Sequence, residues 1–234
     1  MHWHGAIGTL WRMTIEIPSA LSAQREPLIS GLNTLGLDGD RLSEPLLQYL
    51  ALMLKWNATY NLTAITEPYE MVVKHVLDSA AMHTSVRDLA AKGGSIADLG
   101  AGAGLPGIVL SVIYPQLHVT MIESAGKKVR FMREAIRQLG LPHTRAEHVR
   151  IEAYRPDALF DAITARALAT LPELIRLGAH LLKPGGELLA MKAVFPAEEI
   201  ANLPSPWQVV ADRELEVPYL QAQRRLMRVA ASHG

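Results

Sequence analysis

Hydrophobic residues recur at two different spacings, and the change between them divides the chain in two. Between about 19 and 89, apolar side chains return every three to four positions, which is the spacing of amphipathic helices. The pattern predicts one helix over about 19–37 and another over about 43–57. Ser43 is the predicted N-cap of the second helix, and the proline two residues later falls in its first turn. A third helix is predicted to begin near Pro68.

After about residue 90, short apolar runs of strand length alternate with helical segments. Strands are predicted over 95–99, 118–123, 144–147, 160–165 and 187–191. Helices are predicted over 106–113, 126–139 and 172–182. This alternation is typical of a doubly wound, mostly parallel sheet, whose ligand lies at the carboxyl ends of the strands. The tail on either side of Pro218 predicts two further strands and an antiparallel finish.

These patterns predict three parts: a flexible extension over 1–18, a helical cap over 19–89 that packs on the core, and an α/β core over 90–234. A chain of 234 residues with 49% hydrophobic content can bury one sizeable core. No apolar run approaches the roughly 18 residues of a membrane span, and the N-terminal residues lack a signal-peptide layout. We therefore expect a cytoplasmic protein.

Charge and cysteine content restrict the chemistry. The formal net charge is zero, so any contact with nucleic acid needs a local basic patch. The chain has no cysteine, which excludes disulfides, cysteine-based metal sites and attack by a thiolate.

The stretch after the first predicted strand, DLGAGAGLPG, predicts a nucleoside-binding loop. Glycines at 100 and 102 let a ligand approach the backbone where a Cβ would collide with it. Glu123 ends the next strand, where an acid accepts hydrogen bonds from ribose hydroxyls.

Two cofactors fit this loop. Its last three glycines match G-x-G-x-x-G, so a nicotinamide dinucleotide and an oxidoreductase are one interpretation. Asp98 argues against a pyrophosphate nearby, because two negative charges repel each other. That acid suits the ammonium and sulfonium groups of S-adenosylmethionine, which is the favoured cofactor.

Motifs and residues that the chain lacks limit which atom could accept a methyl group. Pyrimidine C5 needs a cysteine adduct, and the position typical of an Asn/Asp-Pro-Pro-aromatic motif for base amines reads TARA here, over 164–167. A ring nitrogen such as guanine N7 already presents a lone pair and needs no general base.

Several motifs resemble those of known families. The stretches over 160–168 and 181–192 resemble the later strands of class I S-adenosylmethionine-dependent methyltransferases. Over about 43–192 the chain resembles the bacterial small-subunit ribosomal RNA guanine-N7 methyltransferases, also called glucose-inhibited division protein B. The motifs are KWNATYNLTAI, HVLDS, DLGAGAGLPGI, ESAGKKVRFM, ARAL and MK.

The resemblance implies a class I methyltransferase fold, Rossmann-like with an antiparallel closing strand and an N-terminal helical cap. It implies S-adenosylmethionine as cofactor and N7 of a guanine in 16S ribosomal RNA as acceptor, in free RNA or in the assembled small subunit. A ribosome-binding module without catalysis stays a further alternative. We expect a monomer without a metal.

The resemblance also implies roles for individual residues. It implies cofactor contacts from Gly100, Leu105, Glu123, Ile151, Glu152 and Arg166, in addition to Asp98 and Gly102, which the loop pattern itself predicts. Arg150 and Arg166 fall on arginines of the cofactor and RNA site and are the predicted catalytic residues.

Basic residues supply the predicted RNA contacts, which are Lys127, Lys128, Arg130 and Lys192. An arginine at a strand end is costly to bury unpaired, so for Arg166 we favour a ligand over a structural ion pair. For His75 and Asp78, three residues apart on one helix, we expect packing and an internal hydrogen bond rather than a catalytic or metal-binding role.

Overall fold

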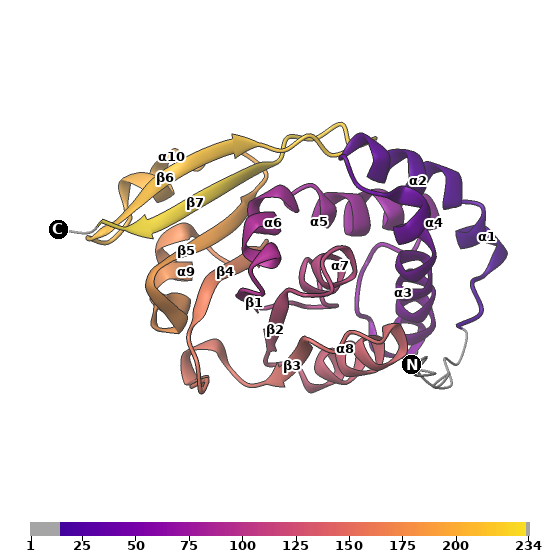
Figure 1. Cartoon of the computed structure of the whole chain (residues 1–234), viewed down its shortest axis with the longest axis horizontal. Coiled ribbons are helices and arrows are strands. Elements are labelled where there is room, and N and C mark those ends of the chain that lie inside the picture. Colours follow the sequence, from indigo (N-terminus) through magenta and orange to yellow (C-terminus); the bar gives the residue numbers. More distant parts are fainter. Residues whose placement is uncertain (1–14, 233–234) are drawn as a thin grey trace, which may run out of the picture.

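A seven-stranded sheet forms the centre of the computed structural model, which describes residues 15–232 (Figure 1). The strands are β1 (Ser95–Leu99), β2 (His118–Glu123), β3 (Thr144–His148), β4 (Phe160–Arg166), β5 (Leu182–Lys192), β6 (Trp207–Glu214) and β7 (Arg225–Ala231). Their order is β3-β2-β1-β4-β5-β7-β6; the first five are parallel, and β7 is antiparallel to both neighbours. The predicted parallel sheet with an antiparallel finish is confirmed.

Helical segments precede the sheet and alternate with its strands. Before β1 the segments are α1 (Ser19–Ser22), α2 (Arg25–Thr34), α3 (Gly39–Tyr60), α4 (Pro68–Met71), the π-helical η1 (Val72–Leu77), α5 (Asp78–Ala80) and α6 (Thr84–Ala91). After β1 they are α7 (Gly107–Ile113), α8 (Gly126–Leu139), η2 (Ile151–Ala153), α9 (Leu171–Gly178), η3 (Ala179–Leu181) and α10 (Ala197–Ala201).

The single helix predicted over 19–37 is wrong, because the chain turns between α1 and α2 at Ala23 and Gln24. Pro27 gives the physical reason. Its ring would clash with the carbonyl of Ala23 in a continuous helix, whereas it is tolerated in the first turn of α2.

The predicted start of the second helix is also wrong. Asp38 is the N-cap of α3, and its carboxylate accepts a hydrogen bond of 3.0 Å from the backbone N–H of Arg41. Ser43 is fully buried inside the helix and donates its hydroxyl back to the carbonyl of Asp40. Pro45 therefore lies within the helix rather than in its first turn.

The remaining predicted elements agree closely with the structure. β1, β2 and α8 have the predicted bounds, and Glu67 caps the helix that starts at Pro68. β5 is longer than predicted, because it begins at Leu182 beside Phe160 and its pairing with β4 shifts register before Glu187.

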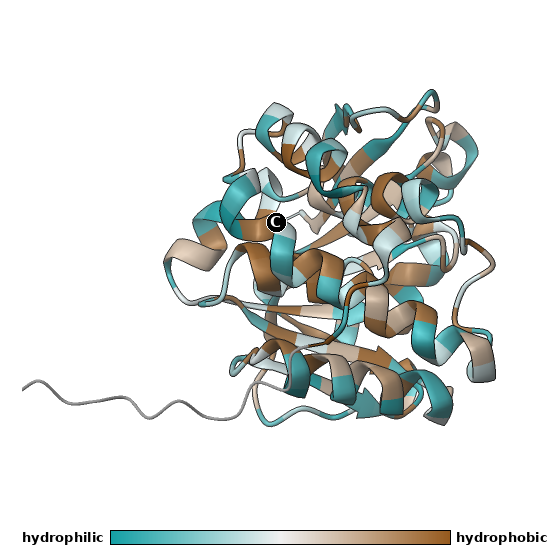
Figure 2. Cartoon of the chain, turned by 90° about the vertical axis from the view of Figure 1, so that its right-hand side faces the viewer, coloured by the Kyte–Doolittle hydropathy of each residue, from teal (hydrophilic) through white to brown (hydrophobic). Residues whose placement is uncertain are grey.

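Two hydrophobic layers cover the sheet, one on each face. Side chains alternate between the two layers along β5, where Leu188 and Ala190 face one and Leu189 and Met191 the other. The larger layer combines the helices before β1 with α7 and α8, and the smaller one contains α9. Figure 2 shows the apolar residues gathered on the strands and on the helix sides that face them.

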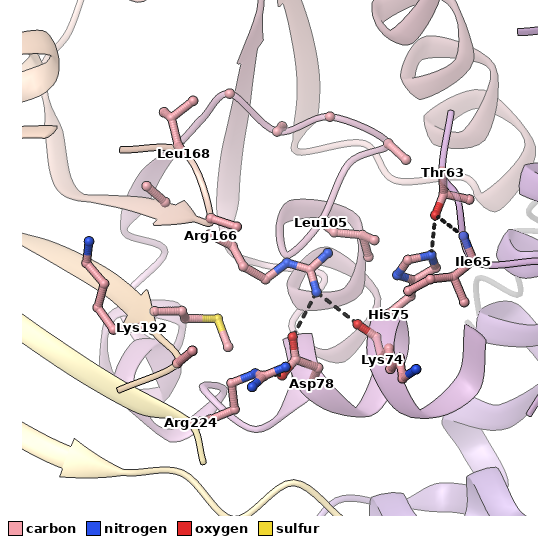
Figure 3. Close-up of a pocket in the computed structure, with 18 of the residues that line it drawn as sticks. Thr63, Ile65, Lys74, His75, Asp78, Leu105, Arg166, Leu168, Lys192 and Arg224 are labelled. Carbon is pink, nitrogen blue, oxygen red and sulfur yellow. Dashed lines mark hydrogen bonds and ion pairs between the residues drawn. The ribbon is translucent and has the colours of Figure 1, made fainter. Parts of the chain in front are cut away.

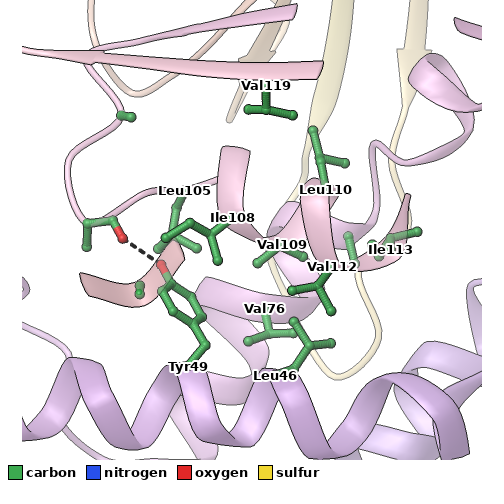
Figure 4. Close-up of a cluster of buried hydrophobic side chains, with 14 of the residues drawn as sticks. Leu46, Tyr49, Val76, Leu105, Ile108, Val109, Leu110, Val112, Ile113 and Val119 are labelled. Atoms are coloured by element: carbon green, nitrogen blue, oxygen red, sulfur yellow. Dashed lines mark hydrogen bonds between the residues drawn. The ribbon is translucent and has the colours of Figure 1, made fainter. Parts of the chain in front are cut away.

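Helix α3 reaches the loop after β1 through one buried contact. Tyr49 is fully buried among Leu46, Val76 and Ile108, and its hydroxyl donates a hydrogen bond of 2.6 Å to the carbonyl of Ala103 (Figure 4). Burial raises the pKa of the Tyr49 phenol, so it stays protonated as the donor. The helical segment thereby supports the loop from below.

The predicted extension over 1–18 lies mostly outside the described residues. Of its last four residues, Ile15 and Ile17 are partly buried against the larger hydrophobic layer. No helix among residues 15–232 is long and apolar enough to cross a membrane.

Candidate active site

The glycine loop between β1 and α7 forms the floor of the site. Gly100 and Gly102 both have a left-handed backbone, with φ of 63° and 60°. A Cβ on Gly100 would lie 2.7 Å from the side chain of Leu168, whereas one on Gly102 would meet nothing closer than a carbonyl oxygen at 4.0 Å. The space beside Gly102 is therefore open to a ligand.

Asp98 lies under this loop and is fully buried. Its Oδ2 accepts a hydrogen bond of 2.9 Å from the N–H of Gly107, and its Oδ1 has no hydrogen-bond partner in the part of the chain that the structure describes. Burial raises the pKa of this carboxyl to about 7, against the opposing effect of the Gly107 hydrogen bond. A cation placed nearby would favour the charged form.

Glu123 joins the end of β2 to the glycine loop. Its carboxylate accepts hydrogen bonds from the N–H groups of Gly102, at 3.1 Å, and Ala125, at 2.8 Å. Lys128 lies 3.8 Å from the same carboxylate. The acid is thus fixed at the carboxyl edge of the sheet, in the position that the sequence predicts.

Two cavities meet at the carboxyl edge of the sheet. The first, of about 530 Å³, is lined by the glycine loop, by the ends of β4 and β5 and by residues of η1. The second, of about 420 Å³, is lined by Glu123, Lys128 and the stretch from Val149 to Glu152. Gly100, Arg166 and Leu168 line both cavities, so one elongated ligand could span them.

Arg166 ends β4 and projects into the first cavity (Figure 3). Its Nη1 donates to Oδ2 of Asp78 at 2.8 Å and to the carbonyl of Lys74 at 3.0 Å. The sequence favoured a ligand over an ion pair here; the structure shows an ion pair, which the sequence did not predict, with the buried carboxylate of Asp78 on α5. Within residues 15–232 its Nε and Nη2 donate no hydrogen bond, so contact with a ligand stays a prediction.

Asp78 also pairs with a second arginine, which sequence reasoning missed. Its Oδ1 accepts a hydrogen bond of 2.7 Å from Nε of Arg224, a residue that precedes β7 and lines the same cavity. The HVLDS motif is the only signal in the sequence that pointed to this position, and it does not reveal the partners.

His75 forms an internal hydrogen bond, as predicted, and its partner is Thr63. The two side chains are 2.9 Å apart in the wall of the first cavity (Figure 3). Burial, together with the positive charge of Arg166, lowers the pKa of His75 to about 4. This histidine is therefore neutral at physiological pH. No cluster of metal-ligating side chains occurs among residues 15–232.

The predicted RNA contacts do not form one group. Lys128 lines the second cavity, whereas Lys127 and Arg130 line neither, and the guanidinium of Arg130 lies 5.9 Å from the ring of Tyr60. Lys192 lines the first cavity, but its Nζ is 2.6 Å from a carboxylate oxygen of Glu199.

All but one of the predicted cofactor and catalytic residues line the two cavities; the exception is Asp98, which is buried beneath the glycine loop and lines neither. Gly100, Gly102, Leu105 and Arg166 line the first, and Glu123, Arg150, Ile151 and Glu152 line the second. S-adenosylmethionine fits this arrangement: the space beside Gly102 is open, and the buried Oδ1 of Asp98 has no partner. Fixed hydrogen-bond acceptors for the ribose are present in Glu123.

Comparison with known proteins gives one consistent result. The model of the GidB family, described as rRNA small subunit methyltransferase G, matches residues 42–227. The chain is 53% identical over 213 residues to ribosomal RNA small subunit methyltransferase G of Stenotrophomonas maltophilia (strain K279a), covering 91% of this chain and 96% of that protein. It is 52% identical over 200 residues to the protein of the same name from Xanthomonas campestris pv. campestris (strain B100), covering 86% and 92%.

A solved structure agrees at the level of fold. TrmN from Thermus thermophilus superposes with a TM-score of 0.52 at 19% identity, over 69% of this chain and 53% of that one. The family model and the two relatives show that the chain belongs to the rRNA small subunit methyltransferase G family, whose members depend on S-adenosylmethionine.

Proposed function

We propose that the protein transfers a methyl group from S-adenosylmethionine to N7 of a guanine in small-subunit (16S) ribosomal RNA. The family and its named relatives support the methyltransferase activity and the class of RNA. They give no support to the nicotinamide-dependent oxidoreductase or to a module without catalysis.

The observation that carries the choice of N7 is the state of the titratable groups in the first cavity. Asp78 is held by two arginines. His75 has its Nε2 bonded to Thr63, and its Nδ1, which has no partner among the described residues, is buried and so cannot be reached from the cavity. Lys74 and Lys192 are paired with acids. Among the described residues that line this cavity, no carboxylate or imidazole is available to remove a proton, which suits a nucleophile that has none to lose.

The bound cofactor supplies an electrophilic methyl group on a sulfonium sulfur. The protein's residues have to bind and align the two reactants, since in-line displacement depends mainly on orientation. In this proposal Glu123 holds the ribose, the glycine loop and Leu105 hold the chain of the cofactor, and Ile151 and Glu152 border its adenine. Arg150 and Arg166 stand between the cofactor and the RNA.

Labelling tests this proposal. The protein is incubated with S-adenosylmethionine labelled in its methyl group and with small subunits from cells that lack the modification, in parallel with free 16S RNA. We expect label in one guanine of the RNA. Label found only on protein, or on several unrelated nucleotides, would reject the proposal.

Replacement of Arg150 tests its assignment to the reaction. Arg150 is exposed and lines the second cavity. Arg150→Ala should lower kcat/KM at least about tenfold, while thermal stability changes by less than about 0.5 kcal/mol, as is usual for a surface residue. Unchanged kcat/KM would remove Arg150 from the site.

The remaining expectations concern the oligomeric state, the cellular location and the absence of a metal. We propose that the protein acts as a monomer in the cytoplasm, without a bound metal, on RNA in the small ribosomal subunit. Light scattering of the purified protein tests the first point, and activity after treatment with a chelator tests the absence of a metal.

A further inference from the structure

Asp78 is a buried carboxylate shared by two arginines from different parts of the chain. Only 5% of its side chain is exposed, and its two oxygens accept hydrogen bonds from Arg166 at 2.8 Å and Arg224 at 2.7 Å. Arg166 lies at the end of β4, Arg224 just before β7, and Asp78 on α5 of the helical part. One side chain therefore fixes two cations at the wall of the first cavity (Figure 3).

The two arginines in the wall of the first cavity carry more positive charge than the one carboxylate paired with them can neutralise. Lys74 is paired with Glu70 at 2.5 Å, and Lys192 with Glu199 at 2.6 Å, so each lysine has its own acid. Arg166 and Arg224 share a single carboxylate, which leaves a cluster of net charge plus one. A phosphodiester carries one negative charge and matches this excess.

The hydrogen-bond capacity of the cluster is also incomplete. Nε and Nη2 of Arg166 and Nη2 of Arg224 donate no hydrogen bond to any residue from 15 to 232. The backbone contributes to this arrangement, because the carbonyl of Lys74, in the π-helical segment η1, accepts from Arg166. Such segments are frequent at functional sites.

We propose that Asp78 is a positioning residue for RNA: it holds Arg166 and Arg224 so that their remaining N–H groups receive a backbone phosphate beside the target nucleotide. This inference rests on the proposed function, because it assumes an RNA substrate. Asp78 touches neither reactant and acts through the two arginines.

Asp78→Asn is the first test. The amide keeps the shape of the side chain but removes its charge, so the cluster goes from plus one to plus two. We expect kcat to fall at least about tenfold, because the arginines are no longer fixed. We also expect the plot of log affinity for 16S RNA against log salt to become steeper by about 0.7 to 0.9. A purely structural role would lower stability and leave this slope unchanged.

Arg224→Ala provides a second test that keeps Asp78 paired with Arg166. The cluster then has no net charge, and the salt slope should become shallower by about 0.7 to 0.9. In the double variant Asp78→Asn/Arg224→Ala the net charge returns to plus one, so the slope should return to its original value while kcat stays low. If neither Asp78→Asn nor Arg224→Ala changes the salt slope, the proposal is overturned. If Asp78→Asn folds poorly, an unchanged slope in Arg224→Ala is enough to overturn it.

Asp161→Asn is the matched control. Asp161 lies at the start of β4, at the opposite end of the strand from Arg166, and accepts hydrogen bonds from Ser95 and Lys183. This variant should keep the original kcat and salt slope. Because the slopes come from binding alone, they test Asp78 separately from methyl transfer, and absent labelling by the unaltered protein would count only against the proposed function.

Discussion

Glu123 is the side chain on which cofactor affinity should depend most directly. Glu123→Ala removes the acceptor for the ribose and also releases the N–H of Gly102 from its hydrogen bond. Loss of a charge-assisted hydrogen bond costs about 1.5 to 3 kcal/mol, so the Kd for S-adenosylmethionine should rise about 10- to 150-fold. Calorimetric titration measures this change.

Glu123→Asp serves as the control, since it keeps a carboxylate at the same position. We expect it to retain more affinity than Glu123→Ala. An unchanged Kd in the alanine variant would contradict the assignment of this acid to the cofactor.

Asp98 should make the stability of the ligand-free protein depend on pH. Burial raises the pKa of this carboxyl to about 7 in the folded protein, whereas in an unfolded chain it is about 3.9. Between these values the folded state binds more protons at this position than the unfolded state. The contribution of Asp98 to stability therefore falls as pH rises through this window, by at most about 1.4 kcal/mol per pH unit.

Asp98→Asn removes this titration. We expect the free energy of unfolding of the variant, relative to the unaltered protein, to increase from pH 5 to pH 7. Urea unfolding at three pH values measures it, and a difference that does not vary with pH would show that Asp98 is not buried as a neutral acid.

Single residues were predictable where their position follows from a strand end. Asp98 and Glu123 come at the ends of β1 and β2, so their place at the carboxyl edge of the sheet is fixed by local sequence. The partner of Arg166 was not predictable, because Asp78 lies 88 residues away and its position depends on how the helical part packs on the sheet. Arg224, 146 residues from Asp78, was missed for the same reason.

The glycine loop offers a test that separates backbone strain from ligand space. Gly102 and Gly140 have nearly the same left-handed backbone, with φ of 60° and 63°, and neither would bring a Cβ into a clash with the protein. Alanine at either position should therefore lower stability by a similar amount, about 1 to 2 kcal/mol. Thermal unfolding of both variants measures this cost.

Of these two glycines, Gly102 lines the first cavity and Gly140 does not, because Gly140 is the C-terminal cap of α8. Gly102→Ala should therefore weaken S-adenosylmethionine binding at least about tenfold, whereas Gly140→Ala should leave it unchanged. Equal affinities in the two variants would mean that the cofactor does not approach the backbone at Gly102.

Elements were predicted best where burial and turn signals coincide. The strands β1 and β2 are short apolar runs with clear ends, and their bounds were correct. The predicted start of α3 was wrong because Ser43 and Pro45 have the residue types and spacing of a helix start, although both lie inside the helix. The N-cap is Asp38. The π-helical form of η1 left no mark in the hydrophobic pattern.

The whole molecule has no net charge, so its attraction to RNA must come from local surfaces. Lys127 and Arg130 lie exposed on α8, outside both cavities. Replacing both with alanine should make the salt dependence of RNA binding shallower by about 1.4 to 1.8 and leave kcat unchanged. Lys128 is not included, because it contacts Glu123.

Arg137→Ala is the control on the same helix. Its guanidinium donates two hydrogen bonds to the carboxylate of Glu134, at 2.9 and 2.8 Å, so it should contribute little to RNA binding. If Arg137→Ala and the double variant change the slope equally per residue removed, α8 carries no defined RNA contact.

The architecture followed from the sequence because its alternation of strands and helices allows few arrangements. The packing of the helical part against the sheet could not be predicted from this alternation. It depends on contacts such as that of Tyr49 with the carbonyl of Ala103, 54 residues apart. The shape of the first cavity is set by that packing, so its wall of Thr63, His75 and Asp78 emerged only from the structure.

Mapping 7-methylguanine in 16S RNA tests the central claim most directly. RNA from cells with and without this protein is treated with borohydride and aniline, which cleave the chain at 7-methylguanine. The account predicts one cleavage site that depends on the protein and returns when it is supplied again. Identical cleavage patterns in the presence and absence of the protein would contradict it.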